Sequence, residues 1–277
     1  MDCQRYPITP EWKVVAIATD KYLKPTYAFA DPSLPAPYVP KYGQDITFGM
    51  KRPAPGGHNV GSNEADLKKK MEKLLEIFAS NDASGMARRL FNAFLKKQPK
   101  VTYFDDTSLD AAAASHPNIR SFGGSALNAP GFRQTAGKTR IHQALKAANW
   151  DIKQMIIPTD LGVPAFNKGS KWTVSGDFGN GLGVMINGVQ HVYVSASHYH
   201  YDPSANKYCI QLHFVFYDVF GLDDDDLDEY GAESDSWTSR IPAVGITAWW
   251  QLQHQFGYAP LVTRIRTRHD FIEVSTV

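Results

Sequence analysis

Cysteine is nearly absent from this sequence, because Cys3 and Cys209 are the only two among 277 residues. Two cysteines are too few for a disulfide-rich scaffold, and they do not form the CxxC pairs of a zinc knuckle. We therefore expect a protein that is made in a reducing compartment. Cys209 lies in an apolar, strand-like segment, where a small residue usually belongs to the core, so it is a weak candidate for a nucleophile.

Long apolar runs are also missing, and none approaches the roughly 20 residues that span a bilayer as a helix. The first residues lack the basic region and the apolar stretch of about 7–15 residues that make up a secretion signal. We therefore expect no transmembrane segment and synthesis in the cytoplasm. Any later secretion would use a route that needs no cleaved signal.

An excess of charge of either sign is absent as well. The 29 basic and 28 acidic side chains leave a formal net charge of +1. No global field would attract the protein to nucleic acid or to anionic lipid, and we expect no nucleic-acid partner. Apolar residues make up 43% of the chain, enough for a sizeable core.

The composition divides the chain into three segments, which could still form one continuous domain. Residues 1–61 include a stretch rich in proline and glycine from residue 24 onward, which predicts an extended arm. Residues 62–158 predict a helical region: two amphipathic helices separated at 81–85 would form a helical hairpin, and a third would begin at Thr139. Between them, residues 105–138 are typical of irregular structure.

Residues 159–277 are rich in β-branched and aromatic residues and predict strands. Segments 189–201 and 208–220 would form a long antiparallel hairpin around the loop at 202–206. A helix over 247–256 and a last strand over 261–274 would follow. The predicted fold class is α+β, with an N-terminal extended arm, a helical hairpin, and a C-terminal antiparallel sheet that carries a packed helix.

Histidines provide the main candidate site. A hairpin with this loop would place His198 and His200 beside Cys209, Gln211 and His213 on one face. Tyr193, Ile210, Leu212, Phe214, Phe216 and, by parity, His191 would face the other way. The three histidines could ligate a metal or act as general acid or base, with Asp218 or an aspartate of the acidic loop at 223–229 as orienting partner. A solvated sheet surface without chemistry is the alternative.

An acidic run provides a second candidate. Its carboxylates could bind a divalent cation, although the glycine and glutamate of a calcium loop are missing. A solvated, partner-facing patch is the preferred interpretation, and the cofactor is left unknown. The candidate binding residues here are Asp223, Asp224, Asp225 and Asp226, followed by Asp228 and Glu229. A glycine-rich string at 131–139 has five residues between its glycines, where a phosphate loop needs four.

Two motifs carry a resemblance to a known family. Residues 217–226 read YDVFGLDDDD, and residues 249–260 read WWQLQHQFGYAP. Over about residues 185–265 the chain resembles an uncharacterised bacterial domain family with a "DHFGLD" turn and a later "W-x-LQ…GY-x-PF-x-T" segment. The matched positions include Asp218, Asp223, Gln253 and Tyr258. The histidine of the family's turn is absent here, and Leu261 replaces the phenylalanine.

The resemblance implies a function, because this family is associated with polymorphic toxins and type VI secretion cargo, often beside an immunity gene. We therefore expect an antibacterial effector toxin, delivered by a secretion apparatus, neutralised by a cognate immunity protein and acting on a cell-envelope substrate. A hydrolase with histidine and aspartate chemistry is favoured. A non-catalytic adaptor of a secretion system and a membrane-disrupting toxin are the alternatives.

Overall fold

The computed structural model describes residues 1–9, 12–57, 59–125, 140–159, 161–164, 179–186, 188–231 and 240–276. Three features of the sequence lie outside these residues: the predicted cap at Thr139, the glycine-rich string at 131–139, and the residues near Trp172 where a strand-like composition begins. In the described part the chain forms an α+β fold, as predicted, with helices packed against a mixed sheet.

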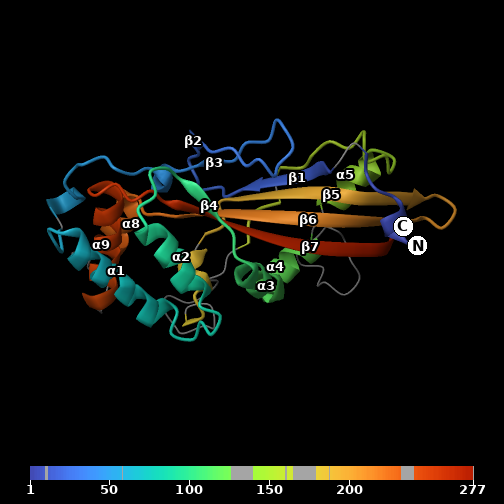
Figure 1. Cartoon of the computed structure of the whole chain (residues 1–277). Coiled ribbons are helices and arrows are strands. Elements are labelled where there is room, and N and C mark those ends of the chain that lie inside the picture. The colour runs from blue at the N-terminus through green and yellow to red at the C-terminus, as the bar shows by residue number, and fades with distance from the viewer. Residues whose placement is uncertain are drawn as a thin grey trace.

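The main sheet has five strands in the order β1-β5-β6-β7-β4. Their bounds are β1 Lys13–Thr19, β4 Thr102–Phe104, β5 His191–Asp202, β6 Lys207–Phe220 and β7 Leu261–Ser275. The neighbours pair antiparallel, except that β4 runs parallel to β7. The predicted hairpin and last strand are therefore present. Their long strands give the molecule an elongated shape, with both termini near the hairpin tip (Figure 1).

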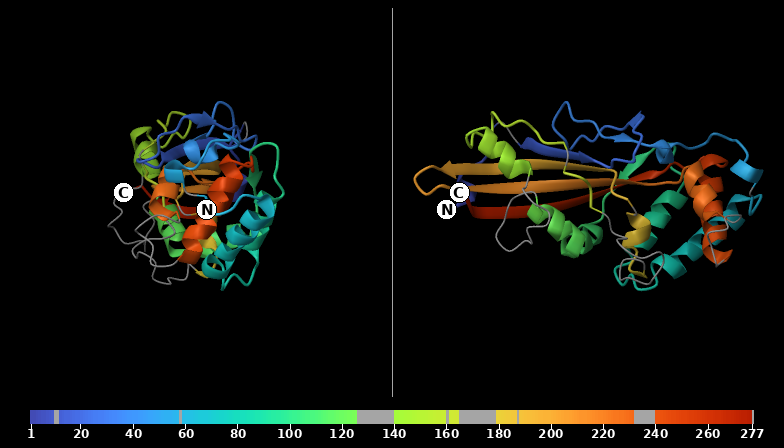
Figure 2. Two further views of the ribbon diagram at one scale, coloured as in Figure 1. Left: turned by 90° about the vertical axis from the view of Figure 1, so that its left-hand side faces the viewer. Right: turned by 180° about the vertical axis from the view of Figure 1, so that it is seen from behind.

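The helices gather mainly at the other end of the sheet, as the view from behind also shows (Figure 2). Helix α1 packs chiefly along α9, with α2 and α8 beside them. Their bounds are α1 Glu64–Phe78, α2 Met86–Leu95, α7 Leu182–Met185, α8 Asp224–Tyr230 and α9 Arg240–His254. The sequence offers Ser62 or Asn63 as the cap of α1, and Asn63 is the cap, accepting a hydrogen bond from the Asp66 amide.

The remaining elements lie along the two faces of the sheet. On the helical side are α3 Thr107–Ser115, α4 Pro117–Ser125 and α5 Arg140–Ala147, whose apolar residues join the main core. On the other side lies the N-terminal part of the chain. It contains η1 Cys3–Arg5, β2 Tyr27–Ala28, β3 Lys41–Tyr42, η2 Gln44–Ile46 and η3 Pro55–Gly57.

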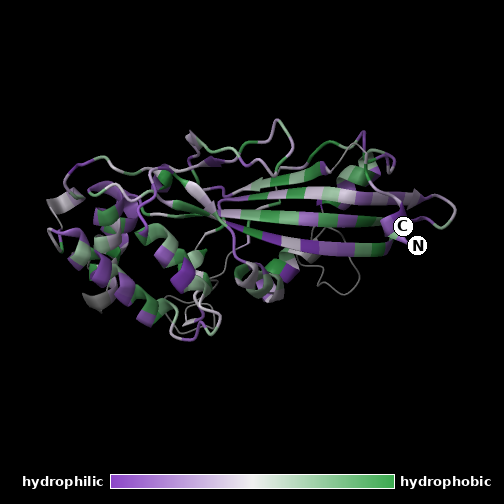
Figure 3. Ribbon diagram, in the orientation of Figure 1, coloured by the Kyte–Doolittle hydropathy of each residue, from purple (hydrophilic) through white to green (hydrophobic). Residues whose placement is uncertain are grey.

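Strand alternation separates two hydrophobic cores. Leu212, Phe214 and Phe216 point to the helical side, whereas Val215, Tyr217 and Val219 point to the N-terminal side. Apolar and polar positions accordingly alternate along the long strands in Figure 3. Polar side chains on the N-terminal side gather toward the hairpin tip, beyond the second core. This is where the candidate histidines lie.

Three expectations about local structure were wrong. Residues 13–19 form β1 and pair with β5, so the first segment is part of the sheet as well as an arm. Most of the described part of 105–138, namely residues 105–125, is helical, and Asp106 caps α3 through two backbone amides. The acidic run is helix α8 rather than a loop. The boundaries predicted at residues 61 and 158 do not separate structural units, because all three segments contribute strands to the one main sheet.

Candidate functional site

A β-bulge in β5 determines which side chains share the histidine face. The pairing of β5 with β6 runs from His191 with Tyr217 to Ala196 with Leu212, and then continues with His198 opposite Gln211. Ser197 is therefore an extra residue in β5, without a partner directly across. His198, His200 and His213 still share one face, as predicted.

Ser197 lies at the centre of a hydrogen-bonded group on this face. Its Oγ is 2.9 Å from His213 Nε2 and 3.0 Å from His198 Nδ1. The same hydroxyl donates to Gln211 Oε1 at 2.7 Å. A hydroxyl has one proton, so two arrangements are possible. If Ser197 donates that proton to Gln211, both imidazoles must donate an N–H to Ser197 Oγ. If Ser197 donates to His213 instead, His213 Nε2 carries no proton and is the acceptor. We call Ser197, His198, Gln211 and His213 the Ser197 cluster.

His213 is the imidazole of the cluster with the most perturbed surroundings. The Trp12 ring lies over it with a centroid separation of 4.2 Å. Burial lowers the pKa of His213, and the positive charge of Arg268 lowers it further. Arg268 lies directly opposite on β7 and binds Asp270 at 3.0 and 3.1 Å. A neutral His213 can accept a proton near neutral pH.

His200 lies two residues after His198 on β5, toward the hairpin tip, and makes different contacts. Its ring stacks on Tyr6 at a centroid separation of 3.8 Å, and its strand partner is Cys209. Cys209 forms a disulfide with Cys3, against the expectation of two reduced thiols. Sequence spacing gives no indication of this pairing, which bridges 206 positions.

His191 and Tyr193 were assigned to the wrong face. The extra residue at the bulge reverses the parity of β5 before that point, so both share the face of His198 and His213. His191 lies near the far end of the strand, where its ring hydrogen-bonds the Lys41 carbonyl and the Thr19 hydroxyl. Burial lowers its pKa. These contacts give His191 a structural role beneath the N-terminal arm.

Asp218 does not lie with the histidines. It pairs with Thr263 and shares the strand parity of Phe214 and Phe216, so it is buried toward the helical side. It therefore cannot orient His198 or His213, and the predicted role of Asp218 as their orienting partner is wrong. The carboxylate nearest to the Ser197 cluster along the sheet is Asp270, which pairs with Gln211. Its pKa is lowered, first by its hydrogen bond from Arg268.

The acidic run is divided between internal contacts and solvent. Asp223 and Asp226 form a capping box at the start of α8. Asp224 binds Arg52 and accepts from Trp250 Nε1 at 3.2 Å. Burial raises the pKa of Asp226, and also that of the nearby Asp45, to about 7. Asp225, Asp228 and Glu229 are exposed.

The other matched motif residues make internal hydrogen bonds, Gln253 to the turn before the acidic run and Tyr258 to the start of α1. The Gln253 amide donates to the carbonyls of Asp45, Thr47 and Leu222, and its oxygen accepts from the Leu222 amide at 3.0 Å. The Tyr258 hydroxyl donates to Glu64 at 2.6 Å. Both side chains are fully buried, and their hydrogen bonds join parts of the fold, which gives each of them a structural role.

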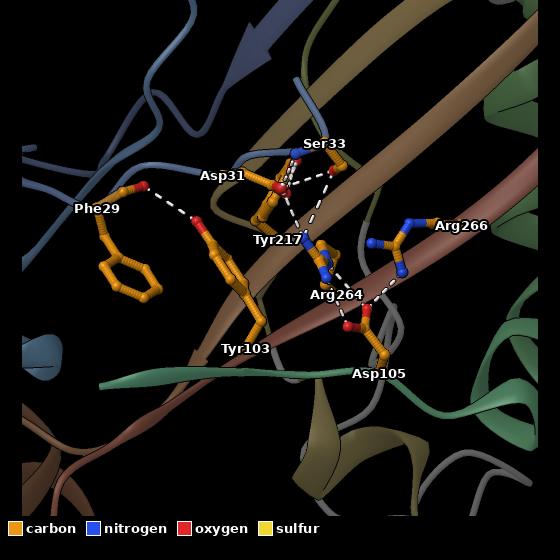
Figure 4. A network of polar contacts seen from close by, with 8 residues as sticks. All are labelled: Phe29, Asp31, Ser33, Tyr103, Asp105, Tyr217, Arg264 and Arg266. Carbon is orange, nitrogen blue, oxygen red and sulfur yellow. Dashed lines mark hydrogen bonds and ion pairs between the residues drawn. The ribbon is translucent and has the colours of Figure 1, made fainter. Parts of the chain in front are cut away.

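A second polar network crosses the same face of the sheet nearer its middle (Figure 4). Asp31 accepts from Arg264 at 2.6 Å and from the Tyr217 hydroxyl at 2.7 Å. Arg264 also binds Asp105, which binds Arg266. Tyr103 donates to the Phe29 carbonyl. The network joins the arm, the start of α3 and β7, and its charges pair with each other.

The described residues contain no three histidine, cysteine, aspartate or glutamate side chains arranged to hold a metal ion. The same part of the chain has no helix of sufficient length and apolar character to cross a membrane. No protein-family model, curated protein or solved structure matches this chain. The functional interpretation therefore depends on the Ser197 cluster and on the motifs quoted above.

Sequence reasoning missed several residues of the site: Ser197, Trp12, Tyr6, Arg268 and Asp270. An isolated serine in a strand carries no signal, and the position of a bulge depends on pairing with other strands. The alternating arginines of β7 were visible in the sequence. Their register against β6 was not.

Proposed function

We propose that this chain is an antibacterial effector toxin that hydrolyses a cell-envelope substrate and is neutralised by a cognate immunity protein. The single observation that carries the chemistry is the position of Ser197 Oγ, within hydrogen-bond distance of two imidazoles. The resemblance to a family of polymorphic toxins and secretion cargo supports the biological setting.

The proposed reaction uses the hydroxyl as nucleophile. Ser197 Oγ would attack the carbonyl carbon of an ester or amide while its proton passes to His213 Nε2. The protonated His213 would then return that proton to the leaving group, and water would hydrolyse the acyl-serine. His198 Nδ1 can donate to Oγ and keep the hydroxyl aligned. Gln211 offers an alternative acceptor for the proton, so activation requires the hydroxyl to turn toward His213.

One observation favours the non-catalytic adaptor as the second candidate. Ser197 is only 8% exposed, and its hydroxyl already shares contacts with three side chains. A polar cluster in which each group is paired can serve the packing of a sheet alone. Substitutions within the Ser197 cluster distinguish the hydrolase from the adaptor.

The test is growth of bacteria that express the chain in the cytoplasm or, with an added export signal, in the periplasm. Killing by the exported form alone is the result expected of a toxin that acts in the envelope. Ser197→Ala and His213→Gln should each lower the killing by at least about a hundredfold in viable counts, the usual contribution of acid–base catalysis. Co-expression of the immunity protein should restore growth.

Ser195→Ala is the matched control, because Ser195 is buried on the same strand but takes no part in the hydrogen-bonded cluster. It should kill like the parent chain. Circular dichroism and urea unfolding would establish that the variants fold. Full killing by a folded Ser197→Ala variant would reject the nucleophile, and no killing by the parent in either compartment would favour the adaptor.

A further inference from the structure

The first eight residues lie against the hairpin beside the Ser197 cluster. This N-terminal segment, residues 1–8, contains η1 and follows the free edge of β5 beyond the end of β1. Figure 1 shows it beside the hairpin tip, close to the C-terminus. About two thirds of the sequence separates it from the cluster, so its position there is a tertiary contact.

Backbone pairing joins this segment to the bulge itself. The Ile8 amide donates to the Ser197 carbonyl at 2.8 Å, and the Tyr199 amide donates to the Tyr6 carbonyl at 3.0 Å. Pro7 forms the bridge opposite His198. These contacts hold the backbone at the Ser197 carbonyl and on both sides of His198. A bulged residue has no partner across β6, so the N-terminal segment supplies the backbone pairing that Ser197 lacks on that side.

The disulfide is the strongest attachment of the segment. Cys3 is 5% exposed and Cys209 is fully buried, with their Cα atoms 5.7 Å apart. The other attachments are non-covalent and partly exposed, since Tyr6 is 40% exposed and the Met1 amino group pairs with Glu273 of β7, whose side chain is 53% exposed. Without the covalent bond, two backbone hydrogen bonds, one ring stack and this ion pair would have to hold the segment.

We propose that the Cys3–Cys209 disulfide is an oxidation-dependent switch that docks residues 1–8 and thereby assembles the Ser197 site. The inference rests on the proposed function, because it names the regulation of that same site. The two thiols would transfer two electrons and two protons to an oxidised glutathione-type disulfide, which leaves as two thiols. The site would be incomplete in a reducing cytoplasm and would assemble in an oxidising envelope compartment.

Amide hydrogen exchange tests the docking without reference to toxicity. The full chain is compared in its oxidised form, after treatment with dithiothreitol, and as the Cys3→Ser variant, which leaves Cys209 in the core. The Ile8 and Tyr199 amides should exchange at least tenfold faster in the reduced chain and in the variant. The Gln190 amide, which donates to the Tyr217 carbonyl at the other end of β5, should not change. Dithiothreitol should have no further effect on Cys3→Ser.

Equal protection of Ile8 and Tyr199 in the oxidised chain and in Cys3→Ser would overturn the switch, since the segment would then dock without the disulfide. The outcome is separable from the proposed function. If the parent is toxic and protection is unchanged, only the switch fails. If the parent is not toxic and protection falls as expected, the effector function fails and the oxidation-dependent docking stands.

Discussion

At the scale of single residues, the imidazole of His213 is the group on which the proposed chemistry depends. A general base must be neutral, and burial together with Arg268 lowers the pKa of His213. A lowered pKa keeps the ring neutral further into the acid range, so activity should persist at mildly acidic pH. Asp270, which pairs with Arg268, acts in the opposite direction, because its negative charge raises the pKa of His213.

Substitution of Arg268 by glutamine should therefore raise the pKa of His213. The positive charge is lost and the charge of Asp270 is released, and both changes favour the imidazolium ion. NMR titration of the His213 ring protons measures this increase in pKa. Arg89→Gln, which removes an arginine from α2, is the control. An unchanged or lower pKa in Arg268→Gln would show that Arg268 does not act on His213.

At the scale of elements, helix α8 offers an acidic surface for a partner. Asp225 and Asp228 are exposed on it, whereas Asp223 and Asp226 hold the start of the helix through the capping box. Gln253 fixes the preceding turn, so the helix is presented in a defined position. Basic residues of an immunity protein would complement the exposed carboxylates.

The double variant Asp225→Asn with Asp228→Asn should weaken the complex with the immunity protein by about tenfold at low salt. Salt screens exposed charges, so the difference should shrink as ionic strength rises. Calorimetry at two salt concentrations measures both effects. Glu72→Gln, an exposed carboxylate on α1, serves as the control. Unchanged affinity of the double variant at low salt would place the interface elsewhere.

At the scale of the whole molecule, the Asp31 network ties the N-terminal arm to the sheet. The side chain of Asp31 has no solvent exposure, and that of Arg264 is 11% exposed. Burial alone would raise the pKa of Asp31, but hydrogen bonds from Ser33, Arg264 and Tyr217 outweigh it and hold the pKa below its usual range. A carboxylate with a lowered pKa stabilises the fold above its unfolded-state pKa and loses that contribution as the pH falls.

Asp31→Asn should lower the free energy of unfolding by about 3 kcal/mol at pH 7, because the buried Arg264 keeps only Asp105 as a charged partner and the buried Tyr217 hydroxyl loses its carboxylate acceptor. The difference from the parent should diminish below about pH 4, where Asp31 becomes protonated in the unfolded and then in the folded chain. Urea unfolding followed by tryptophan fluorescence measures this. Asp2→Asn, in an exposed pair, should change stability little. Equal stability of Asp31→Asn and the parent at pH 7 would contradict a stabilising network.

Local patterns in the sequence were sufficient for the elements that have a strong periodicity. The apolar spacing of Leu67, Met71 and Leu74 predicts α1, and the β-branched and aromatic runs predict the hairpin, because these signals need only residues close in sequence. The α+β class follows from them. So does the shared face of His198, His200 and His213, which lie near the hairpin loop.

Other features were decided only by the tertiary structure. The bulge at Ser197 turned His191 and Tyr193 to the histidine face, and the docking of residues 1–8 brought Cys3 to Cys209. Asp270 and Arg268 reached the site through the register of β7 against β6. Each depends on pairing between segments far apart in the chain. The free energy of such pairing comes from the assembled sheet and its two cores, which no local pattern contains.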